Sequence, residues 1–358
     1  DYFGYKEDTV EPIPDLITDA LWNRAERRTD LEEAYKFMRM AKYILKRIIL
    51  MFFVFFVITT ICFVLIRILP RELPADKVMA ASIQARWDAL GYNEPLLVQY
   101  GIYWKNILTN WDFGTSWYIS YRTPAWDLLT TRLAPTVLIN LYSLAFSIPM
   151  GLLLGIYAAI KKNKWQDSVI STLIIVFVSV PNYVYAFLVQ YFFYFKWGIL
   201  PLQMFSLADA GGSYFTGKMF WSMIAPILSL SFAEIAGLCR FTRAELTETL
   251  TSDYMLLART KGLTRDQATA RHALKNAMVP ILPMIISSFF SVLGGSMIIE
   301  QIFGVPGVGP LYLMAIRLFD YDVFMLDSIF YTFIGLVAGI VVDLSYGFID
   351  PRIRMGER

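Results

Sequence analysis

The sequence predicts an all-α, polytopic membrane protein with six transmembrane helices. Two observations lead to this class. The 358-residue chain is 56% hydrophobic and only 17% charged, a balance that ordinary soluble domains do not have. Its apolar residues also gather in stretches of about 20 residues or more, the length of helix that crosses the hydrocarbon layer of a bilayer. The net charge of +2 says little, because in such proteins the placement of charge matters more than its sum.

The expected spans fall at six places along the chain: residues 48–69, 134–160, 169–195, 219–239, 281–303 and 324–348. Pro149 in the second and Pro181 in the third should each kink a helix, because proline removes a backbone donor. Outside the spans we expect an N-terminal extension, a large loop, a projecting segment and a short tail. They comprise residues 1–47, 70–133, 251–280 (within the membrane core 134–348) and 349–358.

Lysine and arginine predict the orientation, because cytoplasmic loops carry an excess of both. Lysines follow the second span, arginines lie in the tail, and the segment 251–280 is rich in both residue types. The connectors on the other side hold few, with Lys196 and Lys218 flanking one and Arg317 in another. Both termini and the segment 251–280 are therefore expected to be cytoplasmic, and the loop 70–133 extracytoplasmic.

The two segments around the first span each leave alternatives open. Residues 31–47 could form an amphipathic helix on the membrane surface, or a solvated extension that anchors the first span, which we favour. In the large loop, residues 75–90 are expected to form a helix stopped by Gly91. The tryptophans of this loop indicate either anchoring at the membrane interface or a surface that meets a partner: Trp87, Trp104, Trp111 and Trp117.

Polar side chains interrupt several spans, and four of them are candidates for lining a translocation path: Asn140, Asn182, Glu234 and Glu300. The alternative is hydrogen bonding between helices, worth about 0.6 kcal/mol for each bond. A carboxylate in mid-membrane costs about 2.5–3.5 kcal/mol, so Glu234 should face protein or water. Glu300 is expected near the outer end of its span, where snorkelling lowers that cost. Residues 304–310 should form an irregular turn, because they are dense in glycine and proline.

The segment 251–280 reads as two short helices joined at Gly262. Tyr254, Leu257, Ala258 and Lys261 recur at helical spacing and are expected to share one face. Gly262 can adopt the left-handed conformation that ends a helix. Thr264 and Gln267 form a capping box that restarts the helix, and Pro280 follows it. A charged helix–glycine–helix elbow between spans is expected to be a docking device.

Several function classes are excluded or disfavoured by residues that the sequence lacks. It contains no phosphate-binding glycine–lysine loop, so the chain does not bind ATP by that route. Two cysteines and one histidine make a disulfide framework, a metal centre or histidine-based catalysis unexpected. We therefore expect no cofactor and a transport role driven by an ion gradient or by a partner.

Runs of residues spread over most of the chain carry a family resemblance. In the elbow these are Asp253-Tyr254, Ala258-Arg259, Lys261-Gly262-Leu263 and Arg271-His272-Ala273-Leu274-Lys275-Asn276-Ala277 to Pro280. Others include Asp112-Phe113-Gly114-Thr115-Ser116, Glu300-Gln301-Ile302-Phe303, Pro306-Gly307-Val308-Gly309 and Asp320-Tyr321. From about Ile44 to Arg354 the chain resembles the permease subunits of ABC importers, in their dipeptide and oligopeptide branch. It departs from the general permease pattern at Leu256, where a glutamate is usual, and its N-terminal segment is longer.

The resemblance implies a half-channel in a bacterial or archaeal cell membrane, paired with a second homologous permease. It further implies two cytosolic ATP-binding subunits, which hydrolyse the ATP, an extracytoplasmic substrate-binding protein and a peptide substrate. Nucleic acid is not expected as a partner. Trp111 and Trp117 would contact the binding protein. The residues that would couple to an ATPase subunit are Asp253, Tyr254, Ala258, Arg259, Lys261, Gly262, Leu263, Arg271, His272, Asn276 and Pro280.

Three questions stay open at this point. For His272 we favour packing between helices over hydrogen bonding within the elbow. An ion-gradient-driven secondary transporter is the alternative function, since such carriers often hold carboxylates within the membrane. A membrane-embedded enzyme is disfavoured because no catalytic constellation is present. The sequence does not distinguish a dipeptide, a longer peptide, glutathione or a nickel complex as cargo.

Overall fold

A computed structural model describes residues 15–69, 73, 75–294 and 296–349. It divides into two compact units, residues 1–53 and 54–358. Helix α1 (Asp15–Ile68) contributes to both. In the first unit the described residues are helical throughout, so a helix over residues 31–47 is confirmed. Its contact with a membrane stays a prediction.

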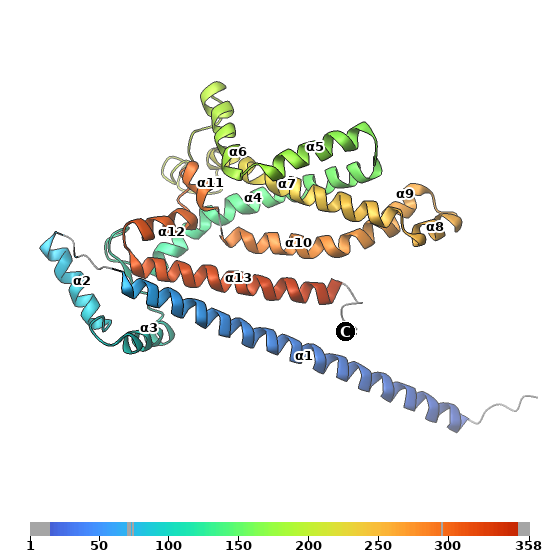
Figure 1. Ribbon diagram of the computed structural model, residues 1–358, viewed down its shortest axis with the longest axis horizontal. Helices are drawn as coiled ribbons and strands as arrows, with labels where there is room; N and C mark the ends of the chain where they lie inside the picture. The colour runs from blue at the N-terminus through green and yellow to red at the C-terminus, as the bar shows by residue number, and fades with distance from the viewer. Residues whose placement is uncertain (1–14, 70–72, 74, 295, 350–358) are drawn as a thin grey trace, which may run out of the picture. The chain divides into compact units, whose positions relative to one another are not determined.

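Most of the second unit is a bundle of long helices. α4 (Ala125–Ile160) lies along α7 (Gly217–Leu250), and α10 (Leu274–Gly294) packs on α13 (Tyr321–Ile349) (Figure 1). Two glycines allow α4 to approach α7 closely. A Cβ atom at Gly155 would lie 2.6 Å from Thr242 Cβ, and one at Gly151 would lie 2.9 Å from Leu238 Cβ. The same pair of helices is joined by the hydroxyls of Ser143 and Ser231, 3.0 Å apart.

The polytopic helical class is confirmed. Among the described residues, five helices are long and apolar enough to cross a membrane, and a sixth crossing results if a bent pair is counted as one span. The five are Ala41–Ile68, Ala125–Ile160, Gly217–Leu250, Arg265–Val292 and Tyr321–Ser345. Which side each end faces stays a prediction.

The third expected span is not one helix. α5 (Trp165–Ser179) ends before Pro181, and α6 (Asn182–Val189) continues into a π-helical turn, η1 (Gln190–Lys196). The two halves meet at an angle of 102°. Proline disfavours a helical conformation in the residue before it, and Val180 is extended, with φ −96° and ψ 130°. The expected kink at Pro181 is therefore a full break.

α5 is held to α7 by an ion pair near its start. Arg243 Nε and one terminal nitrogen lie 2.5 and 2.8 Å from the two carboxylate oxygens of Asp167. The backbone N–H of Asn163 and the hydroxyl of Ser171 also donate to this carboxylate. A buried ion pair needs such additional hydrogen bonds to offset its desolvation.

The fifth span also differs from the expectation, at both of its ends. One continuous helix runs from Arg265 to Val292, formed by α9 (Arg265–Ala268), the π-helical η2 (Thr269–Ala273) and α10. Pro280 lies inside it and does not end a short second elbow helix, since membrane helices can tolerate proline when neighbouring groups satisfy the freed carbonyl. A separate helix, α11 (Met297–Ile302), occupies the end of the expected span.

The glycine- and proline-rich run 304–310 is only partly irregular. α12 (Val308–Arg317) begins inside it and carries Gly309 and Pro310 in its first turn. Prolines fit there because the first turn of a helix needs no intrahelical N–H bond. Gly304, at φ +59°, belongs to the turn that precedes α12.

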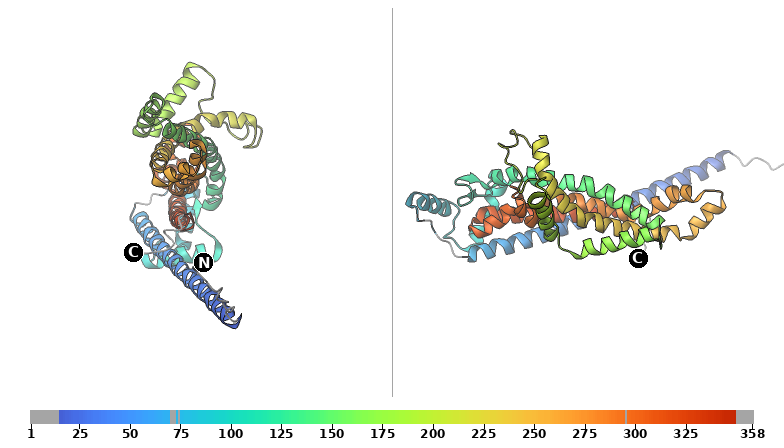
Figure 2. Two further views of the ribbon diagram at one scale, coloured as in Figure 1. Left: turned by 90° about the vertical axis from the view of Figure 1, so that its right-hand side faces the viewer. Right: turned by 90° about the horizontal axis from the view of Figure 1, so that it is seen from above.

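The segment between the first two expected spans is folded. It contains α2 (Lys77–Ala89), α3 (Leu96–Asn110) and an antiparallel pair of short strands, β1 (Thr115–Ser116) and β2 (Thr123–Pro124). The expected helix and its stop at Gly91, with φ +67°, are confirmed. Within the second unit, α2 and α3 lie at one end of the long helices, and α8 (Asp253–Thr260) with α9 lies at the other (Figures 1 and 2).

The close contact of α4 with α7 leads to a testable difference between two glycines. We expect Gly155→Ala to lower stability by about 1–3 kcal/mol, because its methyl group would overlap Thr242 and the carbonyl oxygen of Cys239. Gly237→Ala on α7 is the control, since its methyl group would meet no atom of another element within 4 Å. Thermal unfolding of the two purified variants in detergent measures the difference. Equal melting temperatures would contradict it.

Candidate functional site

The elbow consists of two helices, α8 and α9, and Gly262 lies in the turn between them. α8 ends at Thr260, and Gly262 adopts φ +90°, which brings the N–H of Leu263 to 3.3 Å from the carbonyl oxygen of Ala258. Thr264 and Gln267 then exchange reciprocal side-chain to backbone hydrogen bonds of 3.1 and 3.3 Å. The predicted glycine joint and capping box are therefore confirmed.

One side of the elbow is buried against the long helices. Met255 and Ala258 of α8 form a small apolar core with Leu246 of α7 and Ala159 of α4. Three alanines of the returning helix complete this core, which lets the backbones lie close together: Ala268, Ala273 and Ala277. Ala258 therefore does not share a free face with Tyr254, Leu257 and Lys261, as the spacing had suggested.

The other side of the elbow is exposed and partly apolar. Leu256, Leu257 and Tyr254 are 65%, 55% and 38% exposed. Gly262 and the polar residues predicted to couple are also exposed: Asp253, Arg259, Lys261, Arg271, His272 and Asn276. Leu263 and Pro280 are half-buried. Packing of His272 between helices is therefore wrong, because the helix turns that side chain away from the alanine core.

Of the four candidates for a translocation path, the structure links two. Asn140 donates to the carbonyl oxygen of Thr136 at 2.8 Å, and the hydroxyl of Thr136 bonds to Glu300. Glu234 lies elsewhere and accepts a 2.6 Å hydrogen bond from Ser288 of α10. Asn182 is exposed in the first turn of α6. Three of the four thus have hydrogen-bond partners within the protein, and a role in the path stays a prediction for all four.

Glu300 organises the turn between α11 and α12. It is fully buried rather than snorkelling, and accepts hydrogen bonds from the N–H groups of Gly309 and Ser296, at 3.1 and 3.4 Å. Thr136 accepts from the N–H of Val308 at 2.9 Å, so α4 is tied to the same turn. A Cβ atom at Gly307 would overlap the Glu300 carboxylate, so only glycine fits there.

At the opposite end, two carboxylates hold the loop that follows α3. Asp320 Oδ2 accepts from the hydroxyl of Ser116 at 2.6 Å and from three successive backbone N–H groups, those of Trp117, Tyr118 and Ile119, at 3.1–3.2 Å. Asp322 accepts from the N–H of Thr115 at 3.0 Å. We call this set of bonds the outer latch. It joins β1 and the residues after it to the start of α13.

The outer latch connects two sequence runs whose roles had not been assigned. Both Asp112–Ser116 and Asp320-Tyr321 carried the resemblance, but nothing in the sequence indicated that they meet. The available signal was the pair of aspartates two residues apart at the start of an apolar span, since unpaired carboxylates are costly there. The structure also explains Gly114, because a Cβ atom at this residue would overlap the Asp322 carboxylate.

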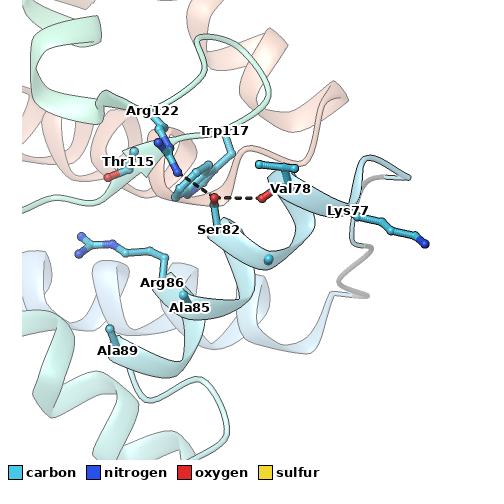
Figure 3. A pocket seen from close by; sticks show the side chains of 10 residues that line it. Lys77, Val78, Ser82, Ala85, Arg86, Ala89, Thr115, Trp117 and Arg122 are labelled. Carbon is cyan, nitrogen blue, oxygen red and sulfur yellow. Dashed lines mark hydrogen bonds between the residues drawn. The ribbon is translucent and has the colours of Figure 1, made fainter.

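The two candidate tryptophans lie differently. Trp111 ends α3 in a left-handed conformation, with φ 54°, and is 61% exposed. Its ring packs edge-on against Phe113 and Trp126, with centroids 5.1 and 5.2 Å apart. Trp117 is half-buried, and its side chain borders a groove beside α2 (Figure 3). Contact of either with a partner stays a prediction.

A bundle of apolar helices with an exposed elbow at one end and a folded segment at the other is the architecture of a multi-pass membrane protein. Comparison with known proteins identifies the family. The sequence model of one protein family, described as "Binding-protein-dependent transport system inner membrane component", matches residues 151–355. A second family model, described as the N-terminal part of such a membrane component, matches residues 40–137. The chain belongs to this family, and the resemblance to ABC-importer permeases is confirmed.

Several relatives match along nearly their whole length. A dipeptide transport system permease protein of Lactococcus lactis is 32% identical over 317 residues, covering 88% of this chain and 100% of that protein. A probable peptide ABC transporter permease protein of Sinorhizobium fredii is 33% identical, covering 88% and 100%. A glutathione transport system permease protein of Salmonella choleraesuis is 31% identical, covering 88% and 99%. The chain is thus a permease subunit of an ABC importer, located in the membrane.

The outer latch predicts a specific effect of removing one charge. We expect Asp320→Asn to cost about 1–3 kcal/mol of stability, because three backbone N–H groups would lose a carboxylate acceptor at this buried position. Limited proteolysis should then cut faster between α3 and α4. The control is Asp127→Asn, an exposed aspartate in the first turn of α4. Cleavage at the same rate in both variants would argue against the latch.

Proposed function

We propose that this chain forms one half of the translocation path of an ATP-driven importer for peptides. The observation that carries the proposal is the full-length similarity to permeases named for dipeptide, peptide and glutathione transport. Glutathione is itself a small peptide, so the three names share one class of cargo. The proposal is made for that class as a whole.

Such an importer requires partners that this chain does not supply. The family description itself refers to a binding protein, which would deliver cargo from the extracytoplasmic side. The sequence has no phosphate-binding loop, so ATP hydrolysis would belong to two cytosolic ATP-binding subunits. A second, homologous permease would complete the path. On this proposal the chain has no catalytic role of its own.

The elbow would be the docking site for an ATP-binding subunit. Its exposed apolar side chains, Tyr254, Leu256 and Leu257, suit a hydrophobic groove on a partner. The basic residues around them favour the cytoplasmic side of the membrane. Because Met255 and Ala258 share one apolar cluster with Ala159 of α4 and Leu246 of α7, a displacement of α8 would act on the ends of both long helices.

The returning arm of the elbow offers a direct path into the membrane. Arg265–Val292 is one helix of 28 residues, so the exposed elbow residues Arg271 and His272 lie on the same rod as the membrane-crossing part of α10. A push on one end of a continuous helix tilts its other end. We propose that closure of the ATP-binding subunits moves α10 as a rigid lever.

The cargo and the energy source are tested together in a reconstituted assembly. The permease pair, the ATP-binding subunits and a binding protein are placed in liposomes, and ATP hydrolysis is measured with a panel of dipeptides, longer peptides and glutathione. We expect at least one peptide to stimulate hydrolysis and to accumulate inside. Peptide uptake by the purified chain alone under a proton gradient would instead support a secondary transporter.

That alternative is weakened by the positions of the two carboxylates that suggested it. Glu234 is bonded to Ser288, and Glu300 holds the turn before α12. Both therefore have a structural use, and neither needs to carry an ion to explain its presence.

Docking through the exposed face of α8 predicts that a charge there uncouples the importer. We expect Leu257→Asp to reduce ATP-dependent uptake at least tenfold and to weaken binding of the ATP-binding subunits, while the chain still inserts and folds. Leu257→Met keeps the apolar contact and should retain uptake. Leu207→Asp places the same charge at an exposed leucine between η1 and α7. If Leu257→Asp transports as well as Leu207→Asp, the elbow is not the docking site.

A further inference from the structure

A groove of about 880 Å³ runs between α2 and the loop that leads from β1 to β2. One wall is the face of α2 formed by Lys77, Val78, Ala81, Ser82, Ala85, Arg86 and Ala89. The other wall consists of Thr115, Trp117 and Arg122 (Figure 3). The groove is open to solvent, and α2, which forms one of its walls, lies at the end of the second unit opposite the elbow (Figure 1).

The wall on α2 is an apolar stripe of small side chains. Residues 78, 81, 82, 85, 86 and 89 recur every three or four positions and so lie on one helix face. The groove is hollow because Ala81, Ala85 and Ala89 have small side chains. Val78, at one end of this row, is 73% exposed. On the opposite face, Ile83 is buried in the protein. α2 thus packs by one side and offers the other to solvent.

All the charged residues that line the groove are basic. Arg122 reaches across it and donates to the hydroxyl of Ser82 at 2.8 Å, and its guanidinium stays exposed. Arg86 bonds to Asp112 at 2.6 Å. Burial alone would raise the pKa of Asp112, but the bonds from Arg86 and from the Gly114 N–H lower it below the ordinary value. Lys77 stands at the far end and points outward (Figure 3).

The groove is held in shape before anything binds. Asp76 caps α2 by accepting from the N–H groups of Val78 and Met79, at 2.8 and 3.0 Å. The outer latch fixes the opposite wall, since Thr115 and Trp117 donate to Asp322 and Asp320. Arg122 itself is held at φ 59°, in the left-handed region that is unfavourable for residues with a side chain. Preorganised walls lower the ordering cost of association.

The chemistry of the groove selects an extended segment that carries carboxylates. Arginine pairs with carboxylates through parallel N–H donors. The alanine face and the Trp117 ring can pack against apolar side chains that neighbour those carboxylates in the same segment. An open groove outside the membrane-crossing helices suits a protein surface better than a small cargo molecule, which is usually enclosed. Resting on the proposed function, we infer that this groove receives an acidic segment of the extracytoplasmic binding protein.

The placement gives that contact a consequence for the membrane helices. Trp117 and Thr115 border the groove and also hold the start of α13 through the outer latch. A binding protein seated in the groove therefore rests on a wall that is bonded directly to a membrane-crossing helix.

Two variants alter the groove in different ways. Arg122→Gln removes its exposed cation, and Ala85→Trp fills its alanine face. We expect each to raise the Kd for the binding protein at least tenfold, while ATPase activity without the binding protein stays unchanged. For the wild type Kd should rise with salt, and for Arg122→Gln this dependence should be weaker. Binding is measured with the assembly in lipid nanodiscs and the purified binding protein that stimulates its ATPase activity.

The controls make the same chemical changes outside the groove. Lys105→Gln removes an exposed cation from α3, and Leu97→Trp adds an indole at an exposed position of α3; both should bind like the wild type. Binding within twofold of the wild type for both groove variants would overturn the inference. So would a free acidic peptide that competes with the binding protein on the wild type and fails to bind both variants, because the groove would then be a cargo site. Failure of the proposed function is distinct: the wild-type assembly itself would show no stimulation by the binding protein.

Discussion

The close contact between α4 and α7 is the constraint on which the rest of the bundle depends. Helices in lipid gain little from burying apolar surface against one another, so their association relies on packing and on hydrogen bonds. Gly151 and Gly155 allow the two backbones to approach, and Ser143 bonds to Ser231 along the same interface. Other elements are then attached to this pair. Arg243 of α7 holds α5 through Asp167, and the elbow closes its alanine core on Ala159 and Leu246, near the ends of α4 and α7.

The two proposed partner surfaces, the elbow and the groove, lie at opposite ends of the second unit, and each is bonded to a long helix (Figure 1). The elbow is continuous with α10, and the groove wall is held by the first residues of α13. α10 and α13 pack on one another. Under the proposed function, events on the two sides of the membrane would thus act on neighbouring helices, without a dedicated signalling element between them. This arrangement accounts for the presence of buried carboxylates at the outer end: they attach irregular segments to helices.

Apolar stretches in the sequence predicted the five long helices, and Gly262 with its capping box predicted the elbow, because span length and glycine conformation are local properties. The effect of a proline was not local. Pro181 breaks its span completely, whereas Pro280 lies inside a continuous helix, and the outcome depends on whether neighbouring groups satisfy the freed carbonyl. The sequence also did not specify the buried side of α8. Tyr254, Leu257 and Met255 are all apolar or aromatic, so helical spacing alone did not identify which of two faces meets the bundle. Glu300 is buried because Thr136 and Gly309 bond to its carboxylate. Thr136 is distant in the sequence and Gly309 lies beyond a turn, so the sequence did not predict these contacts.

The outer latch recognises the loop after β1 mainly through its backbone. Asp320 binds the N–H groups of Trp117, Tyr118 and Ile119, and any residue except proline supplies such a group. The side chains at these three positions are therefore not needed to hold the loop in place. Exchange of these side chains would therefore change the surface that the loop presents, while the attachment of that surface to α13 remains the same.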